Sequence, residues 1–220
     1  MLCRNKIELL PRDIFPYETE TVWHVAAHLG NLKVLEKLWN WAKVKLTTEE
    51  INKLLLATDS NGRTAWHVAV MTGDLKILQK VLEWAEEELT TDEVNNNLIL
   101  GTDSKGRTAW YWAAQEGRIK ALHKIWKWAK ENLTTGDIKN KLLLGTNFEG
   151  KTAWHVAACR GNLEELQYLW EGAKEILTTE EINNELLLGT DAWGRTAWLQ
   201  AAYEGHLEVL NTYGIGLTKY

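Results

Sequence analysis

The chain has 220 residues, 45% of them hydrophobic, with a net charge of −5 and a pI near 5.7. That length is enough for a large buried core. The acidic balance argues against nucleic acid and anionic membranes, because both are bound through clustered Lys and Arg. No stretch approaches the roughly 20 apolar residues that span a bilayer, so we expect no membrane association.

Residues 1–20 lack the apolar run of a signal peptide. Ile7, Leu9 and Leu10 are interpreted as a degenerate copy of a helix that recurs later, and the segment is expected to cap the first repeat. Pro11 and Pro16, the only prolines, follow. Two distant cysteines in different contexts, Cys3 and Cys159, make a disulfide framework improbable. A reducing, cytoplasmic location is therefore expected.

A six-residue motif beginning Thr21-Val22-Trp23-His24 recurs from Thr64, Thr108, Thr152 and Thr196, at spacings of 43, 44, 44 and 44 residues. A period in this range indicates a stacked array, which usually offers a long surface in place of a single catalytic cleft. The array is predicted to span residues 21–210, with repeats starting near 21, 59, 103, 147 and 191. Residues 211–220 cannot complete the last repeat and form a tail.

Residues 59–102 show what one repeat contains. Asp59 to Gly62 predict a turn, and Thr64 is an N-cap for a short helix over 65–71 that ends before Gly73. Asp74 caps a second helix with apolar residues at helical spacing, from Leu75 to Leu89. Thr90 opens a third, shorter helix that Gly101 stops.

Each third helix begins with a Thr followed three residues later by an acid, the capping-box pattern. Thr47–Glu50, Thr90–Glu93 and Thr178–Glu181 match it, whereas Thr134–Asp137 has a shorter acid and Gly136 inside. We therefore expect a weaker cap in the third repeat.

The long helices carry a second apolar stripe, about 100° round from the main one. It comprises Val34/Trp41, Ile77/Trp84 and Ala121/Trp128, and becomes Glu165/Gly172 in the fourth repeat. That break is consistent with a local gap, a shifted third helix or a binding notch.

The pattern Asp-x-x-Gly followed by Thr-x-x-His-x-Ala-Ala-x-x-Gly resembles the ankyrin repeat. The match is good over Asp59–Gly73 and Asn147–Gly161, and partial over Asp103–Gly117 and Asp191–Gly205. The resemblance implies an all-α, ankyrin-like α-solenoid of five stacked helical repeats, with finger turns between them and three helices in each full repeat. It also implies that a partner protein or peptide binds the concave face formed by the fingers and first helices.

Three departures from the family pattern stand out. Ala-Trp or Val-Trp replaces the usual Pro-Leu, the period exceeds the family's 33 by about eleven residues, and Tyr111 and Leu199 replace the His. The extra length falls on the third-helix segments. Armadillo and HEAT repeats have similar lengths, but they do not explain the turn joined to Thr-x-x-His.

The repeated His and Trp residues are interpreted as structural. His24, His67 and His155 are expected to hydrogen-bond the turn backbone, because one His per repeat along a ladder cannot converge on a metal ion. The Trp residues at 23, 66, 110, 154 and 198 are expected to pack in the core. No cofactor, metal ion or catalytic set is predicted, and Cys159 lacks an evident partner base.

Positions at which the repeats differ indicate either neutral sequence variation on the surface or a face that contacts a partner. Exposed aromatics are expected at Phe148, Trp193 and Tyr203, and such residues are typical binding anchors. The predicted partner-binding residues are Tyr111, Trp112, Gln115, Glu116, Phe148, Glu149, Arg160, Trp193, Tyr203 and Glu204.

The sequence therefore favours a non-enzymatic protein-interaction scaffold. Two alternatives remain: a ligand-binding array with a Trp-lined pocket near Glu165 and Gly172, and a structural module that self-associates through its incomplete last repeat.

Overall fold

The computed structural model describes residues 21–214, with side chains described up to Thr212. The predicted capping segment 1–20 and the last residues of the predicted tail, 215–220, lie outside this range. The chain divides into two compact units between Ser104 and Lys105, and each is described by itself. All regular elements of the described residues are helical, as the repeat pattern predicted.

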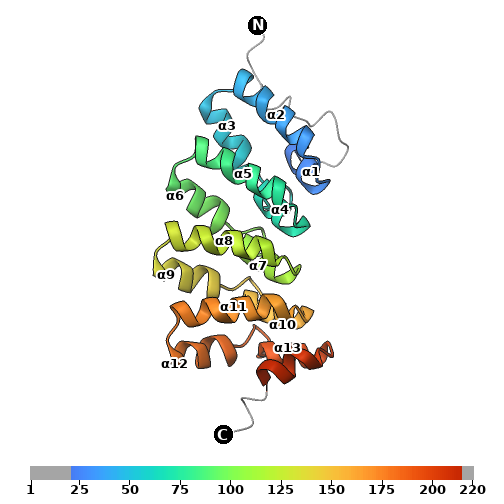
Figure 1. Cartoon of the computed structure of the whole chain (residues 1–220), viewed down its shortest axis with the longest axis vertical. Helices are drawn as coiled ribbons and strands as arrows, with labels where there is room; N and C mark the ends of the chain where they lie inside the picture. The colour runs from blue at the N-terminus through green and yellow to red at the C-terminus, as the bar shows by residue number, and fades with distance from the viewer. Residues whose placement is uncertain (1–20, 215–220) are drawn as a thin grey trace. The chain divides into compact units, whose positions relative to one another are not determined.

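The first unit holds two repeats (Figure 1). Each contributes a short helix, a 14-residue helix and a third helical segment, joined by short turns. Helices α1 and α4 pack together, α1 also packs on α2, and α3 packs on α5. The elements are α1 (Val22–His28), α2 (Leu32–Lys45), α3 (Thr48–Leu55), α4 (Ala65–Thr72), α5 (Leu75–Glu88), α6 (Thr91–Glu93) and the π-helical segment η1 (Val94–Ile99).

The second unit repeats this arrangement and ends in a shortened copy (Figure 1). Helix α10 packs between α7 and α13, and η2 packs on both α10 and α11. The elements are α7 (Ala109–Gln115), α8 (Ile119–Asn132), α9 (Thr135–Asp137), η2 (Ile138–Leu143), α10 (Ala153–Arg160), α11 (Leu163–Ile176), α12 (Thr179–Glu181), η3 (Ile182–Leu187), α13 (Ala197–Tyr203), α14 (Leu207–Val209) and η4 (Leu210–Gly214).

The third-helix caps behave as the sequence predicted. Thr47, Thr90 and Thr178 form full capping boxes, in which the Glu side chain accepts a hydrogen bond from the N-cap N–H. Thr134 still accepts a hydrogen bond from the Asp137 N–H, at 3.1 Å, but the full capping box of the other three is not present. The shorter Asp side chain instead accepts a bond from the Thr134 hydroxyl, at 2.7 Å.

A one-residue insertion explains why the first spacing is 43 and the others 44. From the capping Thr to the Asp or Asn of the next turn there are twelve residues in the first repeat (Thr47 to Asp59) and thirteen in the second (Thr90 to Asp103). The first segment forms a regular α-helix, α3, whereas the later three widen into the π-helical segments η1, η2 and η3. A π-helical turn holds the extra residue and leaves both ends of the segment in place.

Glycine follows each π-helical segment for a steric reason. A Cβ added at Gly101, Gly145 or Gly189 would lie 2.1, 2.3 or 2.1 Å from the carbonyl oxygen four residues earlier. The shorter first repeat has Ala57 at this place. The predicted third helices are therefore present, but three of the four are mainly π-helical.

The break in the second stripe is explained by packing between α8 and α11. A Cβ at Gly172 would lie 3.0 Å from the Trp126 ring, so only Gly lets this ring pack directly on the α11 backbone. The carboxylate of Glu165 is buried and hydrogen-bonds to the backbone of Ile119, at the start of α8. Helix α8 needs this contact because its N-cap, Arg118, makes no side-chain capping bond. The break is thus occupied by packing between α8 and α11, which none of the three interpretations anticipated, and the Trp-lined pocket stays a prediction.

Candidate interaction surface

The finger turns are held from inside by a buried acid or amide. Asp59 Oδ1 accepts hydrogen bonds from the N–H groups of Asn61 and Arg63, at 2.8 and 2.9 Å, and Oδ2 accepts one from Arg63 Nε, at 2.7 Å. Asp191 binds Trp193 and Arg195 in the same way. Burial by itself would raise the pKa of each carboxyl, but the hydrogen bonds from Arg63 and Arg195 outweigh it and lower the pKa. Both turns are thus rigid platforms.

The turn at 147–151 departs from this pattern at several positions together. Asn147 keeps the two turn bonds, to the N–H groups of Glu149 and Lys151, at 3.0 and 2.9 Å. Its amide then donates to the hydroxyl of Tyr111, at 3.1 Å. Because Asn carries no charge, Lys151 is released from the pairing that Arg makes elsewhere and forms an ion pair with Glu149 at 2.9 Å.

Successive turns within the second unit are joined by backbone bonds. The Phe148 N–H donates to the Lys105 carbonyl at 3.0 Å, and the Ala192 N–H donates to the Glu149 carbonyl at 2.9 Å. These bonds set the tips of the turns side by side. We call Phe148, Glu149, Lys151, Trp193 and Arg195 the finger surface.

Two large aromatics of the finger surface face solvent, as predicted. Phe148 is 78% exposed and Trp193 is 59% exposed. One face of Phe148 rests on Gly106, where an added Cβ would lie 2.8 Å from the ring. The ring is thereby positioned but not covered.

Trp193 lies between two cations. Lys151 Nζ is 5.4 Å from its ring centroid and Arg195 Cζ is 4.6 Å away. Exposed cation–π contacts are each worth about 0.5–1 kcal/mol, enough to hold the indole in a preferred orientation. The sequence prediction missed Lys151 and Arg195, although Lys151 at a position that otherwise carries Arg was a detectable signal.

The remaining predicted residues lie at the C-terminal ends of the first helices. Tyr203 and Glu204 are exposed at the end of α13, and Arg160 is exposed at the end of α10. Gln115 and Glu116 are half-buried and bonded to each other at 2.8 Å. The Asn162 amide crosses from the next repeat to the carbonyls of Ala114 and Gln115, at 2.8 and 3.1 Å.

Tyr111 and Trp112 require a correction. They are 5% and 7% exposed, so neither side chain offers a surface to a partner. Tyr111 is held by Asn147, and Trp112 lies under the Arg107 guanidinium, 4.0 Å from the ring centroid. These two residues replace the His-Val pair of other repeats, and both side chains pack inside the second unit.

The histidines bind the turn backbone, as predicted. Nε2 of His24, His67 and His155 lies 3.0–3.1 Å from the carbonyl oxygens of Ala57, Gly101 and Gly189. A carbonyl only accepts, so Nε2 carries the proton, and Nδ1 accepts from the N-cap Thr hydroxyl. Burial lowers the pKa of His67 to about 4 and also lowers the pKa of His155. Both are neutral, structural residues.

Comparison with known protein families agrees with this structure. A model for three copies of the ankyrin repeat matches residues 23–135, and a single ankyrin-repeat model matches residues 149–179. The chain belongs to the ankyrin-repeat family. No curated protein was found to match it. Members of this family are generally protein–protein interaction modules and typically non-enzymatic scaffolds.

Among the described helices, none is both long and apolar enough to cross a membrane.

Proposed function

We propose that the protein binds a partner protein or peptide on the finger surface of its second unit, together with Tyr203, Glu204 and Arg160 at the adjoining ends of the first helices. The observation that carries this proposal is the exposure of three large aromatics on rigid supports, Phe148, Trp193 and Tyr203. Solvent-exposed aromatic side chains on a pre-ordered backbone supply contact area at little entropic cost.

The charges around the aromatics suit a peptide with polar and apolar side chains in alternation. Lys151 and Arg195 flank Trp193, and Glu149 provides the opposite charge beside Phe148. An apolar side chain would lie on an aromatic ring while its neighbours meet these charges. This arrangement matches an interface with aromatic anchors inside a polar rim.

Replacing Phe148, Trp193 and Tyr203 together with Ala tests the proposal. A buried aromatic anchor is worth about 2 kcal/mol, so we expect the affinity for a partner captured by the unaltered chain to fall by well over tenfold. The measurement is a dissociation constant from titration of that partner, with Leu29→Ala/Val44→Ala as the matched control. Both control residues are exposed apolar side chains of the first unit. Unchanged affinity of the triple variant would remove the finger surface from consideration.

The self-association alternative remains a prediction. Leu199 and Leu207 are exposed in the last repeat and would be available to a second copy of the chain.

A further inference from the structure

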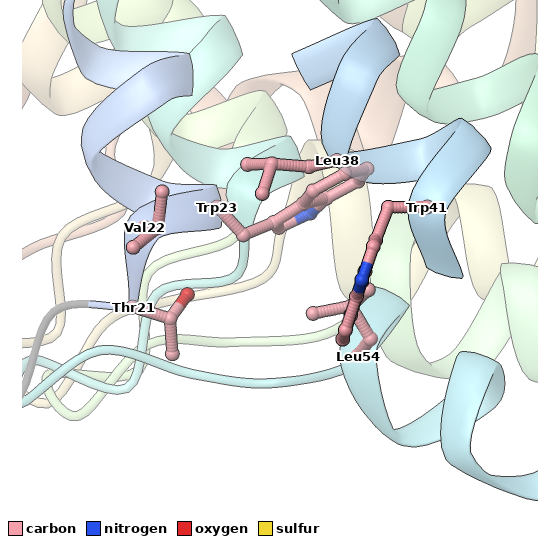
Figure 2. Close-up of a pocket in the computed structure, with 6 residues that line it drawn as sticks. All are labelled: Thr21, Val22, Trp23, Leu38, Trp41 and Leu54. Atoms are coloured by element: carbon pink, nitrogen blue, oxygen red, sulfur yellow. The ribbon is translucent and has the colours of Figure 1, made fainter. Parts of the chain in front are cut away.

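The first repeat has an apolar face that is open in the described residues. Thr21, Val22 and Trp23 of the α1 end, Leu38 and Trp41 of α2, and Leu54 of α3 surround a hollow (Figure 2). Its free volume is about 10 Å³, room for a single water molecule, and its walls are almost wholly apolar. Figure 2 shows Trp41 and Leu54 pointing toward each other at one side of it.

Most equivalent positions in the later repeats are more deeply buried. Trp41 is 39% exposed, whereas its counterpart Trp84 is 5% exposed and Trp128 is half-buried. Leu38 is half-buried, whereas Val81 and Leu169 are fully buried. Leu54 is half-buried, whereas its counterparts Leu98, Leu142 and Leu186 are buried. The first repeat therefore carries side chains suited to a covered face.

Within each unit, the third helix of the preceding repeat provides part of that cover. Helix α3 packs on α5 in the first unit, and η2 packs on α10 and α11 in the second. By analogy, a segment that resembles a third helix would be the matching cover for α1 and α2.

Residues 5–10 have this resemblance. The third helices share a polar residue followed by two large aliphatic residues: Lys53-Leu54-Leu55, Asn97-Leu98-Ile99, Lys141-Leu142-Leu143 and Glu185-Leu186-Leu187. Glu8-Leu9-Leu10 has the same order. The position in the chain also agrees, since Leu54 precedes Thr64 by ten residues and Leu9 precedes Thr21 by twelve.

We propose that residues 5–10 dock on the open face of the first repeat, with Leu9 and Leu10 against Leu38, Trp41 and Leu54. The segment takes the place that a preceding third helix fills in the other repeats. The connection is two residues longer than elsewhere, so the chain reaches the face without strain. It carries Pro11 and Pro16 where the later connections carry the Asp-x-x-Gly turn.

Three features favour residues 5–10 as the segment that covers the open face: their resemblance to the third helices, the length of the connection to Thr21, and their attachment to the same chain. The segment precedes α1 directly in the chain and is joined to Thr21 through residues 11–20. Intramolecular attachment gives a high effective concentration, so a weak apolar contact is enough to keep the face covered.

Alkylation of a reporter cysteine in the full chain tests the docking. In a Cys3→Ser/Cys159→Ser background, Leu38→Cys places a thiol in the hollow. We expect Leu9→Ser/Leu10→Ser to raise its rate of reaction with iodoacetamide at least tenfold. Glu8→Gln is the matched segment control and is expected to leave the rate unchanged. Leu54→Cys is a second reporter in the same hollow. It repeats the measurement without the Leu38 substitution, which could itself weaken docking.

Two further sites check that the chain stays folded. Val44→Cys, on an exposed part of α2, should react at the same rate with and without the Leu9→Ser/Leu10→Ser substitutions. Leu169→Cys, the buried counterpart of Leu38, should stay protected in both chains. Equal rates for both reporters with and without the Leu substitutions would overturn the proposal. Protection that disappears on dilution would overturn it too, because it would assign the face to a second copy of the chain.

Discussion

At the scale of single residues, two substitutions of the repeated His have different structural reasons. His24, His67 and His155 each bind a carbonyl just before the following turn. Tyr111 reaches farther and binds the side chain of that turn, which is Asn147 instead of Asp. Leu199 belongs to the last repeat, where no described turn follows. Leu199 carries no hydrogen-bonding group and is 43% exposed.

The repeated Trp also illustrates a balance of energies. The buried indole N–H groups of Trp23, Trp66 and Trp110 have no hydrogen-bond acceptor, which costs about 1–3 kcal/mol each. Burying some 200 Å² of aromatic surface contributes about 5 kcal/mol. The burial of each ring therefore outweighs its unsatisfied donor.

Stability is expected to decrease in acid through His67. Its pKa falls from 6.5 in the unfolded chain to about 4 in the fold, so between these values the unfolded chain binds the proton and the folded one does not. The contribution is fully present above pH 6.5 and is lost as the pH falls toward 4, by about 1.4 kcal/mol per pH unit. Urea unfolding across this window measures the slope.

The His67→Gln variant is the control for this slope. Gln keeps a side-chain donor for the Gly101 carbonyl but does not titrate, so the slope between pH 6.5 and 4 should become shallower by nearly one proton. The carboxyls of Asp59 and Asp191 act in a separate window, below their ordinary pKa of 3.8. An unchanged slope in the variant would show that His67 is not the titrating group.

At the scale of elements, the extra residue of the 44-residue repeats determines the type of the third helix. Its two ends are fixed, by the capping Thr and by the next finger turn. An added residue cannot move either end, so it widens the helix instead. Glycine after the π-helical segment then becomes necessary because the backbone turns back on the carbonyl four residues earlier.

Gly145→Ala and Gly136→Ala should have opposite effects. A Cβ at Gly145 would lie 2.3 Å from the Lys141 carbonyl oxygen, whereas a Cβ at Gly136 meets only the Thr134 hydroxyl at 3.8 Å. Gly145→Ala should lower the free energy of unfolding by about 1–3 kcal/mol, and Gly136→Ala should raise it by about 0.5–1 kcal/mol. Chemical denaturation of both variants decides this.

Deleting Asn140 in the Gly145→Ala variant should restore stability, since it recreates the 43-residue repeat that carries Ala57. No recovery in the doubly altered chain would contradict the insertion as the cause of the π-helical segment.

At the scale of the whole molecule, stability arises between neighbouring repeats. In the first unit, Trp84 of the second repeat stacks on Trp39 of the first, with ring centroids 4.9 Å apart, and lies 5.4 Å from Trp23. In the second unit, Trp154 and Trp198 of successive repeats meet edge to face at 5.6 Å. Because each repeat contacts only its neighbours, a destabilising substitution is expected to lower the stability of adjacent repeats more than that of distant ones.

Trp84→Ala should therefore weaken the first unit selectively. Loss of a buried Trp costs about 3–5 kcal/mol, and we expect faster hydrogen exchange throughout residues 21–104 with a smaller change in 105–214. Trp154→Ala is the matched control and should reverse the pattern. Uniform loss of protection across both ranges after either change would show that the two units unfold as one.

The sequence by itself determined the helices, their caps and the family, because repeat period, Thr and Asp caps and Gly stops act locally. It also located Phe148, Trp193 and Tyr203 on the surface, since they occupy turn tips and helix ends. The tertiary structure decided which departures from the repeat face solvent. Tyr111, Trp112, Glu165 and Gly172 are buried by residues 36 to 46 positions away in the chain or by a cation above the ring. These contacts form only when successive repeats stack. The sequence pattern within one repeat therefore cannot predict them.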